Sequence, residues 1–120
     1  NANPQNRLLL NDGNGHFTDV TTDRLPASEE PSFDGDFFDL DGDGDLDIIT
    51  SNTVLRSETP AAFSVYLNDG NGFFTLDESI LPATARGNGF DAEFADFNGD
   101  GKKDLYLASR QGMDRLLFWK

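Results

Sequence analysis

Two short segments carry aspartate at alternate positions, a pattern that suits the binding of a hard cation. The first, Asp39–Asp47, reads DLDGDGDLD, and the second, Asp96–Asp104, reads DFNGDGKKD. Both follow the pattern D-x-[DN]-x-D-G-x-x-D. Calcium takes about six to eight oxygen ligands at about 2.3–2.6 Å, and alternate residues of a tightly curled loop point inward. The spacing therefore predicts two Ca²⁺ sites.

Each position of the pattern has an expected role in holding the ion. Positions 1, 3 and 5 offer side-chain oxygens, and the glycine at position 6 permits a sharp reversal of the chain. Position 7 offers only its backbone carbonyl, so Asp45 and Lys102 are interchangeable there. Position 9 closes the site with both carboxylate oxygens. The predicted ligands are Asp39, Asp41, Asp43, Asp45 (carbonyl) and Asp47 in the first site, and Asp96, Asn98, Asp100, Lys102 (carbonyl) and Asp104 in the second.

Other cation sites fit the pattern less well. An EF-hand needs glutamate at position 12, where this chain has Thr50 or Leu107, and a strand-like segment follows in place of a helix. Zinc prefers His and Cys, and Mg²⁺ demands octahedral geometry and resists dehydration. The remaining alternative is a pair of solvated Asp/Gly turns. Without an ion, however, the crowded carboxylates repel one another.

The composition narrows the class of protein. The net charge is −13, which argues against nucleic acid and anionic membrane surfaces as partners, and no apolar run is long enough to cross a bilayer. The absence of cysteine excludes disulfides and thiolate metal sites. We expect no catalytic residue: the single histidine, His16, lies in a turn, and no G-x-S-x-G motif is present. The abundant acidic residues leave open one other possibility, a pair of catalytic carboxylates of the kind that glycosidases use.

The chain repeats itself with a period of 57 residues. The turn Asn-Asp-Gly-Asn-Gly occurs after Leu10 and again after Leu67, and Asp39 and Asp96 begin the two acidic segments at the same separation. Because two different motifs share one period, we interpret the chain as a tandem repeat. The first residue is Asn1, and we expect a processed product or a segment of a longer protein.

One period predicts four strands and no helix. They are expected at about 33–39, 46–51, 63–68 and 73–77, with counterparts of the first two at about 90–96 and 104–109 and a last strand from Arg115 to Lys120. A Ser-, Thr- and Pro-rich connector is expected over 52–62. The fold class is all-β: propeller-like tandem four-stranded antiparallel blades, about two units, incomplete at both ends. Residues 7–20 hold strands three and four of a first unit, 33–78 a complete unit and 90–119 a partial unit. Eleven phenylalanines could build the core.

At these motifs the chain resembles the FG-GAP/VCBS repeat family, found in integrin α-subunit propellers and many bacterial secreted proteins. The resemblance covers most of residues 7–119. It implies propeller blades with Ca²⁺ held between the first and second strands by the ten residues named above. The chain differs from the family in size, because family propellers have about seven blades and this chain holds roughly two.

Our leading hypothesis is a calcium-stabilised extracellular scaffold for assembly or adhesion, which is not an enzyme. Extracellular modules bind calcium at roughly 10⁻⁴–10⁻³ M, so cytosolic calcium would leave such sites empty and we expect a secreted or cell-surface protein. Open sheet edges predict other copies of the chain or adjoining repeats as partners, joined by strand addition, with extracellular protein or glycan as further partners. The alternatives are a ligand- or carbohydrate-binding propeller module and an accessory domain of a larger secreted enzyme.

Overall fold

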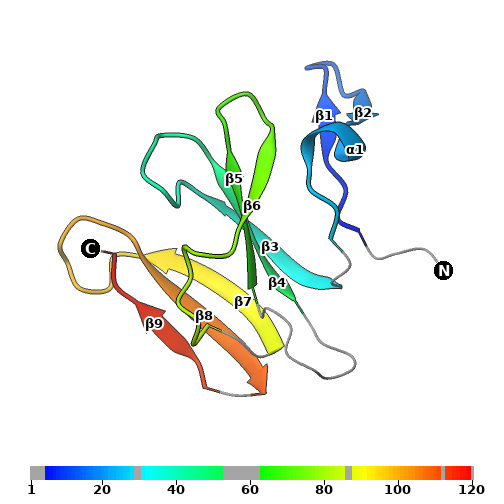
Figure 1. Ribbon diagram of the computed structural model, residues 1–120. Helices are drawn as coiled ribbons and strands as arrows, with labels where there is room; N and C mark the ends of the chain where they lie inside the picture. Colours follow the sequence, from blue (N-terminus) through cyan, green and yellow to red (C-terminus); the bar gives the residue numbers. More distant parts are fainter. Residues whose placement is uncertain (1–4, 29–30, 53–62, 86–87, 112, 120) are drawn as a thin grey trace.

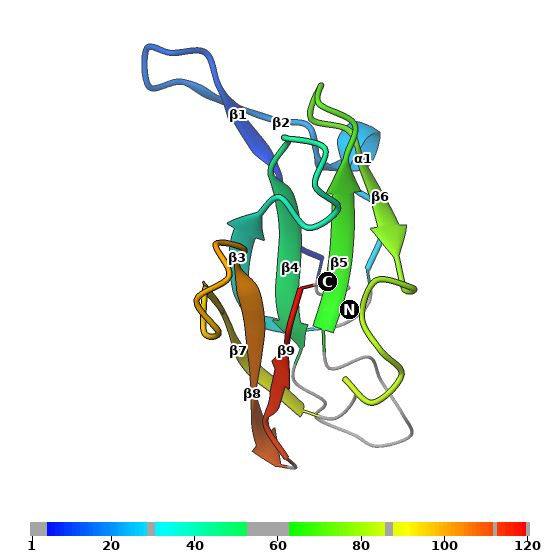
Figure 2. The ribbon, with the colours of Figure 1, turned by 90° about the vertical axis from the view of Figure 1, so that its left-hand side faces the viewer.

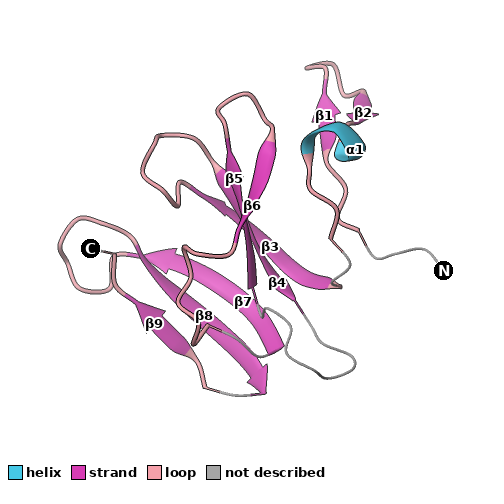
Figure 3. Cartoon of the chain, viewed as in Figure 1, coloured by secondary structure: helices cyan, strands magenta, loops and turns pink. Residues whose placement is uncertain are grey.

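Nearly all of the regular secondary structure in the described part of the chain is β-strand, arranged in three antiparallel sheets (Figure 3). The computed structural model describes residues 5–28, 31–52, 63–85, 88–111 and 113–119. Within them the elements are β1 (Leu9–Asn11), β2 (Phe17–Asp19), α1 (Thr21–Arg24), β3 (Ser32–Phe38), β4 (Asp47–Asn52), β5 (Phe63–Asn68), β6 (Phe74–Asp77), β7 (Asn88–Ala95), β8 (Asp104–Gln111) and β9 (Arg115–Leu117). The predicted all-β, propeller-like repeat fold is thereby confirmed.

The complete unit is the four-stranded sheet β3-β4-β5-β6, in which each strand is antiparallel to the next. Its observed strands match the predicted ranges to within one residue at each end. The sheet β7-β8-β9 repeats the first three strands, and the hairpin β1–β2 corresponds to β5–β6. Most of the predicted connector, residues 53–62, lies outside the described residues.

One helical turn, α1, was not expected from the sequence. Its four residues are too few to show helical periodicity. Asp19 starts the turn by accepting hydrogen bonds from the backbone N–H and the hydroxyl of Thr21, at 3.0 and 2.6 Å. These bonds, followed by the ion pair with Arg7, lower the pKa of Asp19 to about 2. At the other end, Arg24 lies 4.6 Å from the ring centre of Phe73, so α1 is tied to the β5–β6 hairpin.

The core lies between the four-stranded and three-stranded sheets, which pack face to face in Figures 1 and 2. Strand β3 lies beside β7, and two aromatic pairs stack across this contact: Phe33 on Phe90 at 4.9 Å and Phe38 on Phe94 at 4.4 Å between ring centres. The buried apolar residues of the junction are Leu40, Ile49, Phe63, Val65, Ala85, Ala92, Leu105 and Leu107. This junction fixes how one repeat packs on the next.

Phenylalanine does not build this core as expected. Phe63 is the one phenylalanine among the buried apolar residues of the described chain. Seven others are exposed: Phe17, Phe33, Phe37, Phe73, Phe90, Phe97 and Phe118. Aliphatic side chains fill most of the junction instead, with the partly buried Phe38 and Phe94 packed against them.

No helix in the described part of the chain has the length and apolar character needed to cross a membrane.

Candidate metal centre

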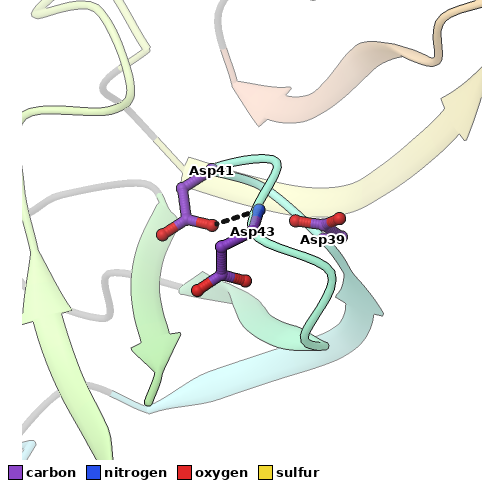
Figure 4. Close-up of side chains that lie close together, drawn as sticks. All are labelled: Asp39, Asp41 and Asp43. Atoms are coloured by element: carbon purple, nitrogen blue, oxygen red, sulfur yellow. Dashed lines mark hydrogen bonds between the residues drawn. The ribbon is translucent and has the colours of Figure 1, made fainter. Parts of the chain in front are cut away.

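The first acidic loop gathers three carboxylates around one point. Strand β3 ends at Phe38 and β4 begins at Asp47, so the residues between them form the turn that joins these strands. Ligand oxygens of Asp39, Asp41 and Asp43 all lie within 4.8 Å of one another (Figure 4). Two oxygens on opposite sides of a Ca²⁺ ion are about 5 Å apart, at about 2.3–2.6 Å from it each. The spacing of these three carboxylates therefore fits a single calcium ion.

The loop is curled by hydrogen bonds from its own backbone to these same side chains. Asp39 accepts from the N–H groups of Gly42 and Gly44, at 2.8 and 3.0 Å. Asp41 accepts from the N–H of Asp43 at 3.1 Å, and Asp43 accepts from that of Asp45 at 2.9 Å. Gly44, at position 6, has φ of +99°, which other residues adopt only with strain.

The second loop repeats this pattern bond by bond. Asp96 accepts from the N–H groups of Gly99 and Gly101, at 2.6 and 2.9 Å. Asn98 accepts from the N–H of Asp100, and Asp100 accepts from that of Lys102, both at 2.9 Å. The bond from Gly101 is the largest cause that lowers the pKa of Asp96. Because Asn98 stands where the first loop has Asp41, this loop holds one carboxylate fewer at its centre.

Asp47 and Asp104, at position 9, are buried rather than open to the loop. Asp47 is 0% exposed, and its two oxygens accept from the N–H groups of Leu40 at 2.7 Å and Asn68 at 2.8 Å. Asp104 does the same with the N–H groups of Phe97 at 3.0 Å and Trp119 at 2.9 Å. Each carboxylate therefore ties its acidic loop to the end of the third strand.

The expected role of Asp47 and Asp104 as closing ligands stays a prediction. A carboxylate oxygen has more than one lone pair, so it can accept a hydrogen bond and also approach a cation. Their backbone partners were not foreseen. One feature of the sequence does point to these partners. In both repeats the position-9 aspartate directly precedes an apolar strand, and an aspartate that is buried there must find hydrogen-bond donors.

The first loop also touches the β5–β6 hairpin at position 7. The Asp45 carboxylate lies against Gly70, and the side-chain amide of Asn68 donates to the Leu46 carbonyl at 3.1 Å. The hairpin turn forms as predicted, because Asn68 accepts from the N–H groups of Gly70 and Gly72, at 3.1 and 2.9 Å. The loop and the hairpin form one connected end of the sheet, as Figure 1 shows.

We expect Gly70→Ala to destabilise the protein more than Gly13→Ala. The two glycines are repeat equivalents with φ of +78° and +88°, so a side chain at either costs about 1–2 kcal/mol of backbone strain. A Cβ at Gly70 would overlap the Asp45 carboxylate, whereas a Cβ at Gly13 meets nothing within 4 Å. Urea unfolding of both variants measures the difference, and equal losses would show that the Asp45 contact contributes nothing.

The charges of the first loop also favour a cation. Burial raises the pKa of Asp41, and the nearby carboxylates of Asp43 and Asp47 raise it further. The folded loop therefore disfavours the charge on Asp41 relative to a free carboxylate, and a divalent cation would offset this cost. The donor set is all oxygen, which suits calcium.

Three further acidic residues, Asp34, Asp36 and Asp91, lie close together where β3 contacts β7, and Glu93 is exposed on β7. Burial, followed by the neighbouring Asp34 carboxyl, raises the pKa of Asp91. These residues lie on β3 and β7, outside the two acidic loops.

Comparison with known protein families gives one match. The chain fits the family described as FG-GAP-like repeat over residues 1–50 and again over 53–107. The two matched stretches together span most of the chain. Comparisons with curated proteins and with solved structures give no significant match.

Proposed function

The chain belongs to the FG-GAP-like repeat family, and from this we propose that it is a calcium-stabilised structural module with one Ca²⁺ in each acidic loop. Its ligands would be Asp39, Asp41, Asp43, Asp47 and the Asp45 carbonyl in the first loop. In the second they would be Asp96, Asn98, Asp100, Asp104 and the Lys102 carbonyl. Calcium would supply charge neutralisation and cross-linking of each loop.

The single observation that carries this proposal is the cluster of Asp39, Asp41 and Asp43, whose ligand oxygens lie within 4.8 Å of one another. The second loop supports it by repeating the same backbone hydrogen bonds around Asp96. Position 9 then links each ion site to the sheet, because Asp47 binds the N–H groups of both Leu40 and Asn68. An ion in the loop would thus stabilise the junction between loop, strand and hairpin.

The family and the chemistry together favour a role outside the cell. FG-GAP-like repeats are typically extracellular structural or binding modules rather than enzymes, and loops of this kind fill at the millimolar calcium found there. We therefore place the protein in the secreted or cell-surface compartment, as a scaffold for adhesion or assembly. The open edge of β9, whose outer side carries no further strand among the described residues, is a site where such assembly can begin.

Thermal melting with and without calcium tests the proposed function. A site filled at ten times its dissociation constant adds about 1.4 kcal/mol, so two sites should raise the melting temperature by about 10 °C. EDTA should reverse the shift, and magnesium at the same concentration should give a smaller one. A melting curve that is the same in calcium and in EDTA would contradict the proposal.

A further inference from the structure

The two acidic loops curl in the same way but differ in the residue at position 3. In the second loop this residue is Asn98, whose side-chain oxygen accepts from the N–H of Asp100 at 2.9 Å. This bond fixes the orientation of the amide, and the amide NH₂ group then donates to the Asp100 carboxylate at 3.2 Å. Two predicted ligands of the second loop are therefore hydrogen-bonded to each other, and part of the Asp100 charge is offset within the chain.

The first loop has no such bond available to it. Position 3 there is Asp41, which accepts from the N–H of Asp43 at 3.1 Å, just as Asn98 accepts from that of Asp100. An ionised carboxylate has no donor, so Asp41 and Asp43 cannot hydrogen-bond to each other when both are charged. Their carboxylates nevertheless lie side by side, as Figure 4 shows. The two like charges repel, and a cation between them would replace that repulsion by attraction.

The charges carried by the two loops differ in the same direction. The first loop has five carboxylates and no cation, whereas the second has three carboxylates and two lysines. Lys102 stands where the first loop has Asp45. Lys103 reaches toward the other unit, with its ammonium 5.6 Å from the ring centre of Phe38, beside the start of the first loop. One ammonium does not offset two additional carboxylates, so the first loop is the more negative. Calcium affinity depends on the number of charged ligands, which is higher there.

We propose that the two loops are unequal calcium sites, of which the first binds calcium about tenfold more tightly and fills first. The second loop keeps its shape through the Asn98 amide and binds calcium weakly. This inference rests on the proposed calcium-binding function and adds the order in which the sites fill. At calcium concentrations between the two dissociation constants, the chain would hold one ion, in the turn between β3 and β4. The protein would thus respond to calcium in two steps.

Calorimetric titration of the full chain with calcium chloride tests the order of filling. The unmodified chain should bind in two steps, with dissociation constants about tenfold apart. Asp96→Ala should keep the tighter step, and Asp39→Ala should keep the weaker one. Circular dichroism of each variant shows whether the sheets remain folded.

Exchange of the residues at position 3 tests the cause without deleting a side chain. Asn98→Asp should tighten the second site about tenfold and lower the melting temperature in EDTA, because repulsion replaces the bond to Asp100. The double variant Asp41→Asn, Asn98→Asp should reverse the order of filling, and it keeps the net charge at −13. Asn14→Asp, in the β1–β2 turn outside both loops, adds the same charge as Asn98→Asp. It should leave both affinities nearly unchanged, since salt screens distant charges.

The outcomes separate this inference from the proposed function. Two ions of equal affinity, or a tighter step that remains in Asp39→Ala, would overturn the unequal sites and leave calcium binding intact. An Asn98→Asp variant whose second site is no tighter than before would overturn the role given to the amide. No heat in the titration, together with no displacement of a bound lanthanide probe by calcium, would contradict the proposed function itself. Two steps that exchange order in the double variant support the inference.

Discussion

Asp47→Ala is expected to lower the free energy of unfolding by about 3–5 kcal/mol, even in the absence of calcium. The carboxylate is fully buried and accepts from the N–H groups of Leu40 and Asn68. Hydrogen bonds to a charged group contribute about 1.5–3 kcal/mol each, and both donors would be left without a partner. Urea unfolding in EDTA measures the loss apart from any effect of an ion.

Two comparisons show whether the loss comes from this pair of bonds. Asp104→Ala should cost a similar amount, because Asp104 makes the same two bonds with Phe97 and Trp119. Asp36→Ala, on β3, should cost less than about 1 kcal/mol, since within the described part of the chain its carboxylate accepts from the adjacent Phe37 N–H alone. If Asp47→Ala unfolds at the same urea concentration as Asp36→Ala, the buried aspartates do not hold the loops to the sheet.

Asp41→Asn is expected to have opposite effects with and without calcium. Burial and neighbouring carboxylates raise the pKa of Asp41, so its charge destabilises the folded chain above that pKa. Asparagine removes the charge and keeps the oxygen that accepts from the Asp43 N–H at 3.1 Å. The variant should therefore melt higher than the unmodified chain in EDTA. In calcium it should lose one strong ligand, and its affinity at that loop should fall about tenfold or more.

Melting curves in EDTA and calcium titrations of the same samples measure both effects. Asp36→Asn is the matched control, because it removes one negative charge near the loop without touching the cluster of Asp39, Asp41 and Asp43. A lower melting temperature of Asp41→Asn in EDTA would show that repulsion in the loop is negligible. An unchanged calcium affinity would show that Asp41 is not a ligand.

The two acidic loops and the hairpin turns could be predicted because the residues that determine them lie close together in the sequence. A curled loop needs acceptors at alternate positions and glycine where φ is positive, and both requirements are visible within nine residues. The strand ranges of the complete unit followed from the same short motifs, which mark where each strand ends. The repeat then extended these assignments from one unit to the next.

The partners of Asp47 could not be predicted, since they depend on register. Asn68 is 21 residues away, and its N–H faces Asp47 only because β5 pairs with β4 so that Val65 lies opposite Ile49. The expectation that the phenylalanines build the core was wrong for a related reason. Phe37 and Phe94 occupy equivalent positions, but Phe94 faces the neighbouring sheet and Phe37 faces an open groove. A strand sequence does not say which neighbour is present.

Calorimetric titration of the full chain with calcium tests most directly whether the acidic loops hold ions. We expect two ions per chain, with dissociation constants of roughly 10⁻⁴–10⁻³ M. Asp39→Ala and Asp96→Ala should each remove one of the two ions, and the double variant should bind none. A titration that gives no heat, together with no competition by calcium for a bound lanthanide probe, would contradict calcium binding by this protein.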